Sequence, residues 1–241
     1  LRQQQIQQRI LTPVKTLARA ANYQQQRFLI TGGLSTLGLL LAEHLAQNGA
    51  DAIILCHNSA ANLGQLQRLT ALEQLGCQVQ IRQLDVCNEQ QVKTLFNDTT
   101  VRLDGIFHLA GTSATTCADE CKLADLQAEK VQSILSPKTT GSWLLHHCSR
   151  SQPLRYFVCF SCVSAVFGCA GQSINSAANY AQSWLASHRH AKGLPALTIS
   201  WSGQSQSAAQ TLETMQQMLL LPNANLLVSS TNFQAKCSYL D

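Results

Sequence analysis

Short, mostly apolar runs constrain the fold of this chain more than any other feature of its sequence. Residues 28–31, 52–56, 105–110, 155–161 and 196–201 are too short for buried helices, and amphipathic segments of helical length separate them. Apolar runs of this kind are typical of parallel strands whose two faces are both covered by helices. We therefore predict an α/β fold: a doubly wound, mostly parallel Rossmann-like sheet flanked by helices on both faces.

The segments between these runs complete the predicted order of elements. The first helix is expected to follow Gly32-Gly33 and to end at about residue 47. Further helices are expected over residues 63–75, 123–147 (interrupted near Pro137), 173–190 and 212–220, and through Val92 and Leu95. Short strands are expected at 79–81 and 226–228. We assign residues 27–241 to one Rossmann-type domain. Residues 1–26 are Gln-rich with a modest helical pattern, which predicts a linker helix, broken near Pro13, at the end of a preceding region.

The composition argues against several classes of function. Of 241 residues 12% are charged, the net charge is +4 and the basic residues are scattered, so we expect no nucleic-acid partner. No apolar run has the length of a membrane span and no signal-peptide pattern opens the chain, so we expect a cytoplasmic protein without a membrane partner. Among ten cysteines only Cys159 and Cys162 have a metal-type spacing, without a second pair; we expect reduced thiols and no metal site.

The first predicted strand ends in a glycine-rich turn, Thr31-Gly32-Gly33-Leu34-Ser35-Thr36-Leu37-Gly38, that opens the first helix. In this context glycines allow the backbone to approach a pyrophosphate, which the N–H groups and the dipole of the helix N-terminus attract. Ser35 stands where a glycine is expected, and its Cβ and hydroxyl crowd the closest approach. The turn is compatible with two interpretations: a phosphate loop, or a strand-to-helix turn that no longer binds nucleotide.

Several motifs make the chain similar to the ketoreductase (KR) domains of modular polyketide synthases, which are of the short-chain dehydrogenase/reductase type. The resemblance extends from about residue 28 to residue 201. It rests on the Thr-Gly-Gly-x-x-x-Leu-Gly turn, on Gly105–Gly111, on Pro137-Lys138-x-x-Gly141, on Phe160-Ser161 with Gly168-x-x-Gly171-Gln172, and on Gly193–Ala196 with Ile199–Trp201.

The resemblance implies an NADPH site at the carboxyl ends of the strands. The residues that it places at the cofactor are Thr31, Gly32, Gly33, Ser35, Gly38, His57, Asp85, Ala110 and Gly111. Asp85 matches the acidic residue near the adenine. His57 replaces an arginine that grips the 2′-phosphate, and an imidazole does so well only when protonated. Leu109 replaces a small alanine on the nicotinamide side. Together these changes lead us to expect weakened or lost NADPH binding.

The resemblance also places four residues at the chemical positions, and two of them have changed. Lys138 and Asn179 match the family's lysine and asparagine, Cys162 falls at the serine that clamps the carbonyl, and Asn175 falls at the tyrosine that protonates the alkoxide. A thiol is a weak hydrogen-bond donor, and an amide transfers no proton at any useful pH. Ser161 and Tyr180 are poor substitutes, because strand alternation and helical rotation turn them away from these positions.

Three hypotheses follow from the sequence. The first is a ketoreductase-like domain of a polyketide synthase, catalytically inactive and retained as a structural part of its module. The second is NADPH-dependent reduction of a carrier-protein-bound β-ketoacyl intermediate, with a water held by Lys138 and Asn179 as the acid. The third is a module that binds nucleotide or an acyl chain without turnover. Each implies as partners the neighbouring domains of the same megasynthase and an acyl carrier protein with its phosphopantetheine-tethered chain.

Overall fold

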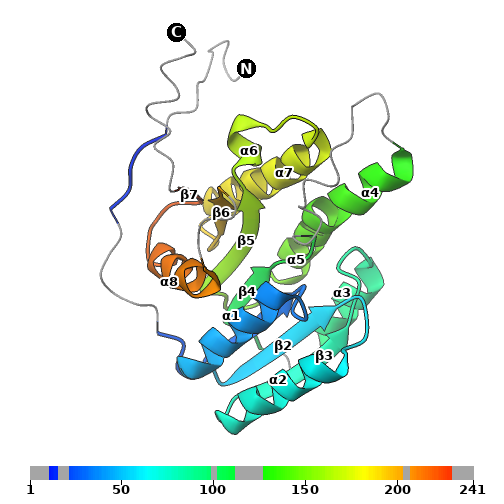
Figure 1. Ribbon diagram of the computed structural model, residues 1–241, viewed down its shortest axis with the longest axis vertical. Coiled ribbons are helices and arrows are strands. Elements are labelled where there is room, and N and C mark those ends of the chain that lie inside the picture. Colours follow the sequence, from blue (N-terminus) through cyan, green and yellow to red (C-terminus); the bar gives the residue numbers. More distant parts are fainter. Residues whose placement is uncertain (1–10, 16–21, 99–101, 112–126, 203–206, 230–241) are drawn as a thin grey trace.

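Seven parallel strands form the centre of the molecule (Figure 1). The computed structural model describes residues 11–15, 22–98, 102–111, 127–202 and 207–229. The sheet has the order β3-β2-β1-β4-β5-β6-β7. Its strands are β1 (Arg27–Thr31), β2 (Ala52–His57), β3 (Gln78–Gln83), β4 (Gly105–His108), β5 (Tyr156–Cys162), β6 (Leu197–Trp201) and β7 (Asn225–Val228). The order reverses between β1 and β4, where a doubly wound sheet opens a crevice at its carboxyl edge.

Helices cover both faces of the sheet, which confirms the predicted fold class. They are α1 (Thr36–Gln47), α2 (Leu63–Gln74), α3 (Glu89–Asn97), α4 (Ala128–Ser136), a π-helical turn η4 (Pro137–Gly141), α5 (Ser142–Cys148), α6 (Ser164–Phe167), α7 (Ser173–His190) and α8 (Ala208–Met218). One apolar core joins the sheet to α1, α2 and α8, and a second joins it to α3, α5 and α7. The described helices include none that is both long and apolar enough to cross a membrane.

Alternation along the strands supplies both cores. In β1, Phe28 and Ile30 belong to the first core and Leu29 to the second, and all three are fully buried. A fully buried side chain of this size contributes about 1.5–3 kcal/mol. A strand with two buried faces therefore favours apolar side chains along most of its length, which explains the mostly apolar runs of the sequence.

The break that we predicted near Pro137 is a widened turn and not a gap. Pro137 has no N–H and cannot donate the bond that an α-helix requires at this position. The chain instead forms the π-helical turn η4 between α4 and α5, so that the three pieces follow one another without a loop. Single π-helical turns within longer helices often occur at functional sites. Here the turn carries Lys138, which is buried.

Two other expectations need correction or lie largely outside the described residues. We predicted a fourth strand through residue 110, but β4 ends at His108, since the N–H of Ala110 bonds to the Thr31 side-chain hydroxyl and not to a backbone carbonyl of the neighbouring strand. Of the linker helix predicted over residues 1–26, only 11–15 and 22–26 are described, and neither stretch is helical.

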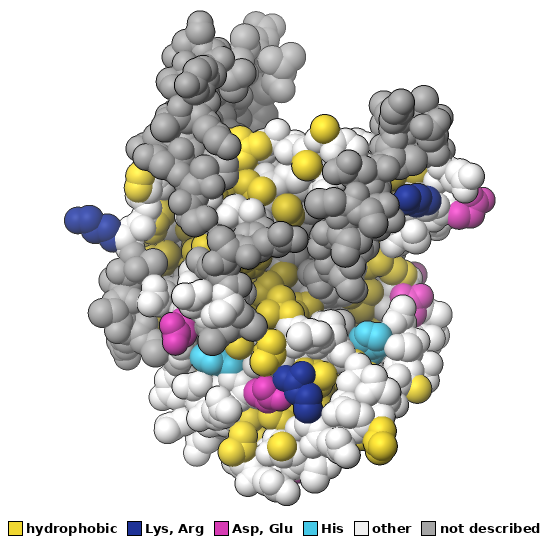
Figure 2. All heavy atoms as spheres, viewed as in Figure 1, with side chains coloured by type: hydrophobic (Ala, Val, Ile, Leu, Met, Phe, Trp, Pro, Cys, Tyr) yellow, Lys and Arg dark blue, Asp and Glu magenta, His cyan; other side chains and the backbone are white. Residues whose placement is uncertain are grey.

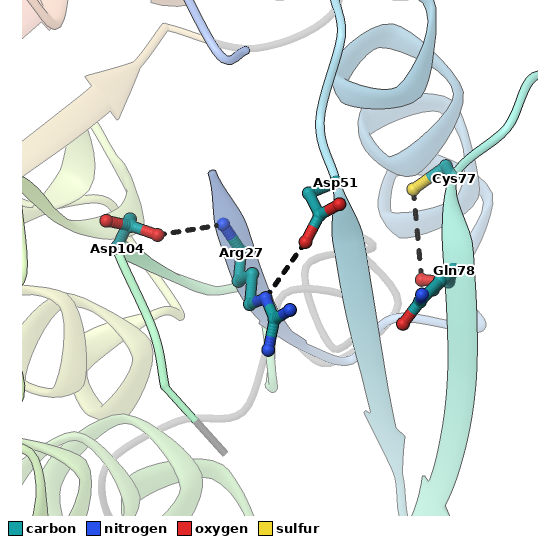
Figure 3. Close-up of polar contacts among 5 residues, drawn as sticks. All are labelled: Arg27, Asp51, Cys77, Gln78 and Asp104. Atoms are coloured by element: carbon teal, nitrogen blue, oxygen red, sulfur yellow. Dashed lines mark hydrogen bonds and ion pairs between the residues drawn. The ribbon is translucent and has the colours of Figure 1, made fainter. Parts of the chain in front are cut away.

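Polar contacts tie the amino ends of three strands together (Figure 3). The Arg27 backbone N–H donates to the Asp104 carboxylate at 3.0 Å, and its guanidinium donates to Asp51 at 2.9 Å. These residues, with Arg102, Arg155 and residues 24–26, line a cavity of about 470 Å³. The cavity lies at the amino ends of the strands. Ligands of doubly wound folds bind at the opposite edge of the sheet, at the carboxyl ends of the strands.

Charged side chains do not gather on the face of the molecule shown in Figure 2. Lys, Arg, Asp and Glu side chains stand singly or in small groups among polar and apolar ones. The described ion pairs are few and mostly exposed, such as Lys93 with Glu89 and Arg82 with Asp98. Pairs of this kind contribute at most about 1 kcal/mol each, so the two apolar cores carry the stability of the fold.

Candidate active site

The glycine-rich turn after β1 is packed too tightly for a side chain at any of its glycines. A Cβ on Gly38 would lie 2.6 Å from the carbonyl oxygen of Gly32, and one on Gly33 would lie 2.9 Å from that of Ile30. Gly32 itself has a φ of +67°, which few residues with a Cβ adopt. The folding of the turn therefore requires these glycines, whether or not a phosphate lies against them.

Ser35 closes the turn as the N-cap of α1. Its backbone is extended (φ −69°, ψ 160°), and its hydroxyl oxygen accepts a hydrogen bond from the Gly38 N–H at 3.1 Å. An N-cap of this type satisfies one of the free N–H groups of a helix start. The same groups are the ones that a helix start offers to an anion. Ser35 therefore occupies one of the N–H groups that the start of α1 would otherwise offer to an anion.

Gln65 also holds this turn, and the sequence analysis missed it. Its amide donates to the Leu34 carbonyl at 2.7 Å, from the capping box of α2 with Asn62. The pattern Asn62-x-x-Gln65 was visible in the sequence as a capping box. No sequence pattern indicates the other hydrogen bond of Gln65, the one to Leu34 in the glycine-rich turn.

His57 and Asp85 lie side by side at the carboxyl ends of β2 and β3. The Leu84 N–H donates to the His57 carbonyl at 2.8 Å. The His57 ring accepts at Nδ1 from the Ser59 backbone N–H at 3.1 Å. The exposed Asp85 accepts from the Cys87 N–H at 2.9 Å. His57 and Asp85 thus both have partners within their own loops.

His108 joins the glycine-rich turn to η4, a role that the sequence analysis did not foresee. Its Nε2 lies 2.9 Å from the Pro137 carbonyl oxygen, which can only accept, so Nε2 carries the proton and donates. Its Nδ1 then accepts from the Thr31 hydroxyl at 2.7 Å. The Thr31 oxygen in turn accepts from the Ala110 N–H at 3.4 Å. Burial lowers the pKa of His108 to about 4, so the ring is neutral at neutral pH.

Lys138 lies at the centre of a buried polar cluster. Its Nζ donates to Oδ1 of Asn179 at 2.8 Å and to Oδ1 of Asn175 at 3.0 Å, and Nδ2 of Asn179 donates to Oδ1 of Asn175 at 3.2 Å. Lys138 is 1% exposed, Asn179 0% and Asn175 8%. The structure thus brings together three of the four residues that we placed at the chemical positions.

Burial is costly for the Lys138 ammonium. No carboxylate bonds to it, since its described partners are the two amide oxygens. Burial lowers its pKa to about 8, and the nearby Cys162 thiol opposes this shift. The side chain packs against Gly111, whose φ is +80° and on which a Cβ would lie 3.1 Å from Pro137. The fold therefore holds this amine in place at a cost in stability.

The other residues considered for the chemistry lie outside this cluster. Cys162 is the last residue of β5, in register with Trp201, and half-buried. Ser161 is 8% exposed, and its hydroxyl donates to the Asn179 backbone carbonyl at 3.5 Å. Tyr180 is 48% exposed on α7. That neither Ser161 nor Tyr180 replaces the missing hydroxyls stays a prediction.

Sequence comparison identifies relatives for most of the chain. The profile of the KR domain family matches residues 27–206. A mycocerosic acid synthase-like polyketide synthase of Mycobacterium tuberculosis is 32% identical over 185 residues, which are 74% of this chain and 8% of that protein. The highly reducing polyketide synthase VdtX of Byssochlamys spectabilis is 30% identical over 172 residues, 71% of this chain and 8% of that protein. The chain thus spans about 8% of the length of these curated relatives.

Solved structures show the same architecture. An N-terminal ketoreductase from the macrolactin assembly line aligns with a TM-score of 0.82 and 28% sequence identity, over 93% of this chain and 49% of that one. An A-type ketoreductase from a modular polyketide synthase aligns with a TM-score of 0.83 at 24% identity, which supports the fold alone.

The close packing of the glycine-rich turn predicts opposite effects for two helix-start glycines. Gly38→Ala should lower the free energy of unfolding by about 2 kcal/mol or more, because the added methyl meets backbone atoms that cannot move aside. Gly64→Ala, in the first turn of α2, should raise it by about 0.5–1 kcal/mol, because its Cβ would meet only Asn62 at 3.6 Å. Urea unfolding of both variants is the measurement. Equal effects would show that the turn is not tightly packed.

The buried neutral histidines predict a loss of stability in mild acid. The folded-state pKa values of His108 and His146 are both lowered by burial to about 4, below the 6.5 of an exposed histidine. The unfolded chain therefore binds more protons as the pH falls through 6.5, and stability is lost progressively down to about 4. For His108 alone the free energy of unfolding should fall by roughly 2 kcal/mol between pH 7.5 and pH 5.

Two variants test this pH dependence. His108→Asn should flatten the fall in the urea midpoint between these pH values, whatever its effect at neutral pH. The exposed His190 is the matched control, and His190→Asn should leave the slope unchanged. A slope that is the same in all three proteins would contradict the assignment to His108.

Proposed function

The chain belongs to the KR domain family, and we propose that it is a polyketide synthase ketoreductase domain that no longer reduces and that serves as a structural part of its module. The observation that carries this proposal is the Lys138 cluster: where a reductase needs a phenol to protonate the alkoxide, this chain has the Asn175 amide. An amide can hold an oxygen but has no proton to give in this pH range.

The Lys138 ammonium does not replace the missing acid. Although a pKa of about 8 would suit a general acid, Nζ is buried, and its bonds point to the amide oxygens of Asn175 and Asn179. A substrate oxygen would have to displace one of these amides to reach it. The same geometry argues against a catalytic water held by Lys138 and Asn179, since Asn179 is fully buried and bonded within the cluster.

The cofactor end supports the same conclusion. NADPH is the cofactor that the KR resemblance implies, and the glycine-rich turn lies between β1 and α1, where a phosphate loop is expected. Ser35, however, takes the Gly38 N–H, and His57 stands where the KR resemblance expects an arginine to meet the 2′-phosphate. The residues present fit the dinucleotide poorly. We propose that NADPH binding is weakened by both changes.

The partners follow from the proteins in which such domains occur. The matching relatives are polyketide synthases many times longer than this chain. We propose that the domain packs against neighbouring domains of one cytoplasmic megasynthase. An acyl carrier protein would bring its phosphopantetheine-tethered chain to the carboxyl edge of the sheet.

A working reductase is the second candidate. Lys138 and Asn179 match the lysine and asparagine of the family and are hydrogen-bonded to each other. The residues that would assist a proton donor are therefore present, although the tyrosine that donates the proton is not. The two candidates differ in one measurable quantity, the NADPH-dependent turnover of a β-ketoacyl thioester.

Restoring the missing groups should restore turnover. We expect wild-type chain to reduce a short β-ketoacyl thioester no faster than Lys138→Ala, and Cys162→Ser with Asn175→Tyr to gain at least about 100-fold, the usual contribution of a positioned general acid. NADPH absorbance gives the rate. Wild-type turnover above the Lys138→Ala level would overturn the proposal in favour of the reductase.

Removing the Ser35 hydroxyl should improve cofactor binding. Ser35→Gly frees the Gly38 N–H for a phosphate oxygen, so the NADPH dissociation constant should fall about tenfold, as for a hydrogen bond to a charged group. The cost in stability should be a few tenths of a kcal/mol, as for other Ser-to-Gly changes at N-caps. Ser207, the N-cap of α8, is the matched control, and Ser207→Gly should leave NADPH fluorescence titrations unchanged. An unchanged affinity in Ser35→Gly would show that the cap does not compete with the cofactor.

A further inference from the structure

The orientation of the Asn175 amide is fixed by the groups behind it. An ammonium only donates, so the Asn175 atom that lies 3.0 Å from Lys138 Nζ must be the oxygen. The same oxygen accepts from Asn179 Nδ2 at 3.2 Å. Both of its lone pairs are therefore in use, and the NH₂ group of Asn175 must point away from Lys138.

This NH₂ group is available to a ligand. Asn175 is 8% exposed, and within the described part of the chain its nitrogen makes no hydrogen bond. Several side-chain nitrogen and oxygen atoms in the described residues are buried and have no partner, but the Asn175 nitrogen is not one of them. Since this nitrogen has no partner, it must be in contact with solvent. A side chain more than nine-tenths buried thus presents an unpaired donor at the position where the KR resemblance places the tyrosine hydroxyl.

Lys138 strengthens this donor. A cation bonded to an amide oxygen draws electron density from the nitrogen, and hydrogen bonds in such a chain reinforce one another. Because the oxygen of Asn175 is saturated, the group has no acceptor to offer. It suits a ligand atom that only accepts, such as a ketone oxygen, better than a hydroxyl, whose hydrogen would remain unpaired.

We propose that Asn175 is a hydrogen-bond donor to the keto oxygen of a β-ketoacyl thioester, so that the domain binds the unreduced intermediate and disfavours the β-hydroxy form. This inference rests on the proposed function, since a domain that reduced the ketone would not retain it. Lys138 and Asn179 are positioning residues here, because they orient the amide and do not touch the ligand.

The test uses the N-acetylcysteamine thioester of 3-oxobutanoate, labelled with ¹³C at the keto carbon, and the purified chain. Calorimetry gives the affinity, and infrared spectroscopy gives the keto stretch. We expect the stretch to move to lower frequency on binding, and the 3-hydroxybutanoyl analogue to bind about tenfold more weakly, the factor of one hydrogen bond. A keto stretch unchanged in wild type, or no measurable binding, overturns the inference without any variant.

Asn175→Asp is the sharpest variant, because aspartate keeps an oxygen facing Lys138 but has no N–H. It should lose the frequency shift and bind the thioester about tenfold or more weakly, with a urea midpoint no lower than that of wild type. Ala177→Asp adds the same charge to an exposed position of α7 and should bind as wild type does. Equal affinity in Asn175→Asp and wild type would overturn the inference.

Adding NADPH separates the two proposals. Formation of the β-hydroxy thioester would contradict the proposed absence of reduction, whereas the keto stretch measured without NADPH would still report the hydrogen bond. A silent domain without a shifted keto stretch would contradict only the role of Asn175.

Discussion

The geometry of the candidate site depends on one buried ammonium. Lys138 has no carboxylate partner, and two amide oxygens replace the water that it lost. Burying an amine in this way is costly, as its pKa of about 8 shows. The ammonium forces both asparagine oxygens to face it, and so it decides where their nitrogens point. The position of Lys138 depends in turn on η4, and that turn is held by the His108 bond to the Pro137 carbonyl.

His108 also connects the two ends of the site. Through the Thr31 hydroxyl it reaches the strand that ends in the glycine-rich turn, and through Pro137 it reaches the lysine. The bond to Thr31 is buried and the bond to Pro137 is partly buried, so removing the ring would leave the Thr31 O–H without an acceptor and the Pro137 carbonyl without this donor. A buried polar group that loses its partner costs about 1–3 kcal/mol. Because a single neutral side chain joins β1, β4 and η4, the cofactor end and the chemical end of the site keep their relative positions.

Much of this could be predicted from the sequence, for a physical reason. Runs such as Phe28–Thr31 are buried on both faces, so their pattern alone indicates parallel strands, and the family motifs located Lys138, Asn175 and Asn179 within one site. What escaped prediction was the direction of hydrogen bonds. The sequence does not show that Ser35 caps Gly38, that Gln65 reaches Leu34, or which end of the Asn175 amide faces the lysine. These depend on side-chain positions that only the packed structure defines.

The structure also separates residues kept by folding from residues kept by chemistry. Gly38 is required by the packing of its own turn, so a glycine-rich motif is weak support for nucleotide binding in this chain. At three of the positions where the sequence analysis places a departure from the family, the residue present has a local partner: Ser35 caps a helix, His57 bonds to Ser59, and Asn175 bonds to Lys138. Because these residues form hydrogen bonds within the protein, the fold accommodates the changes. They alter the groups that a bound ligand would contact. Lys138 is the exception, because it destabilises the fold and yet is present, which is the reason to seek a ligand-binding role for the amide that it orients.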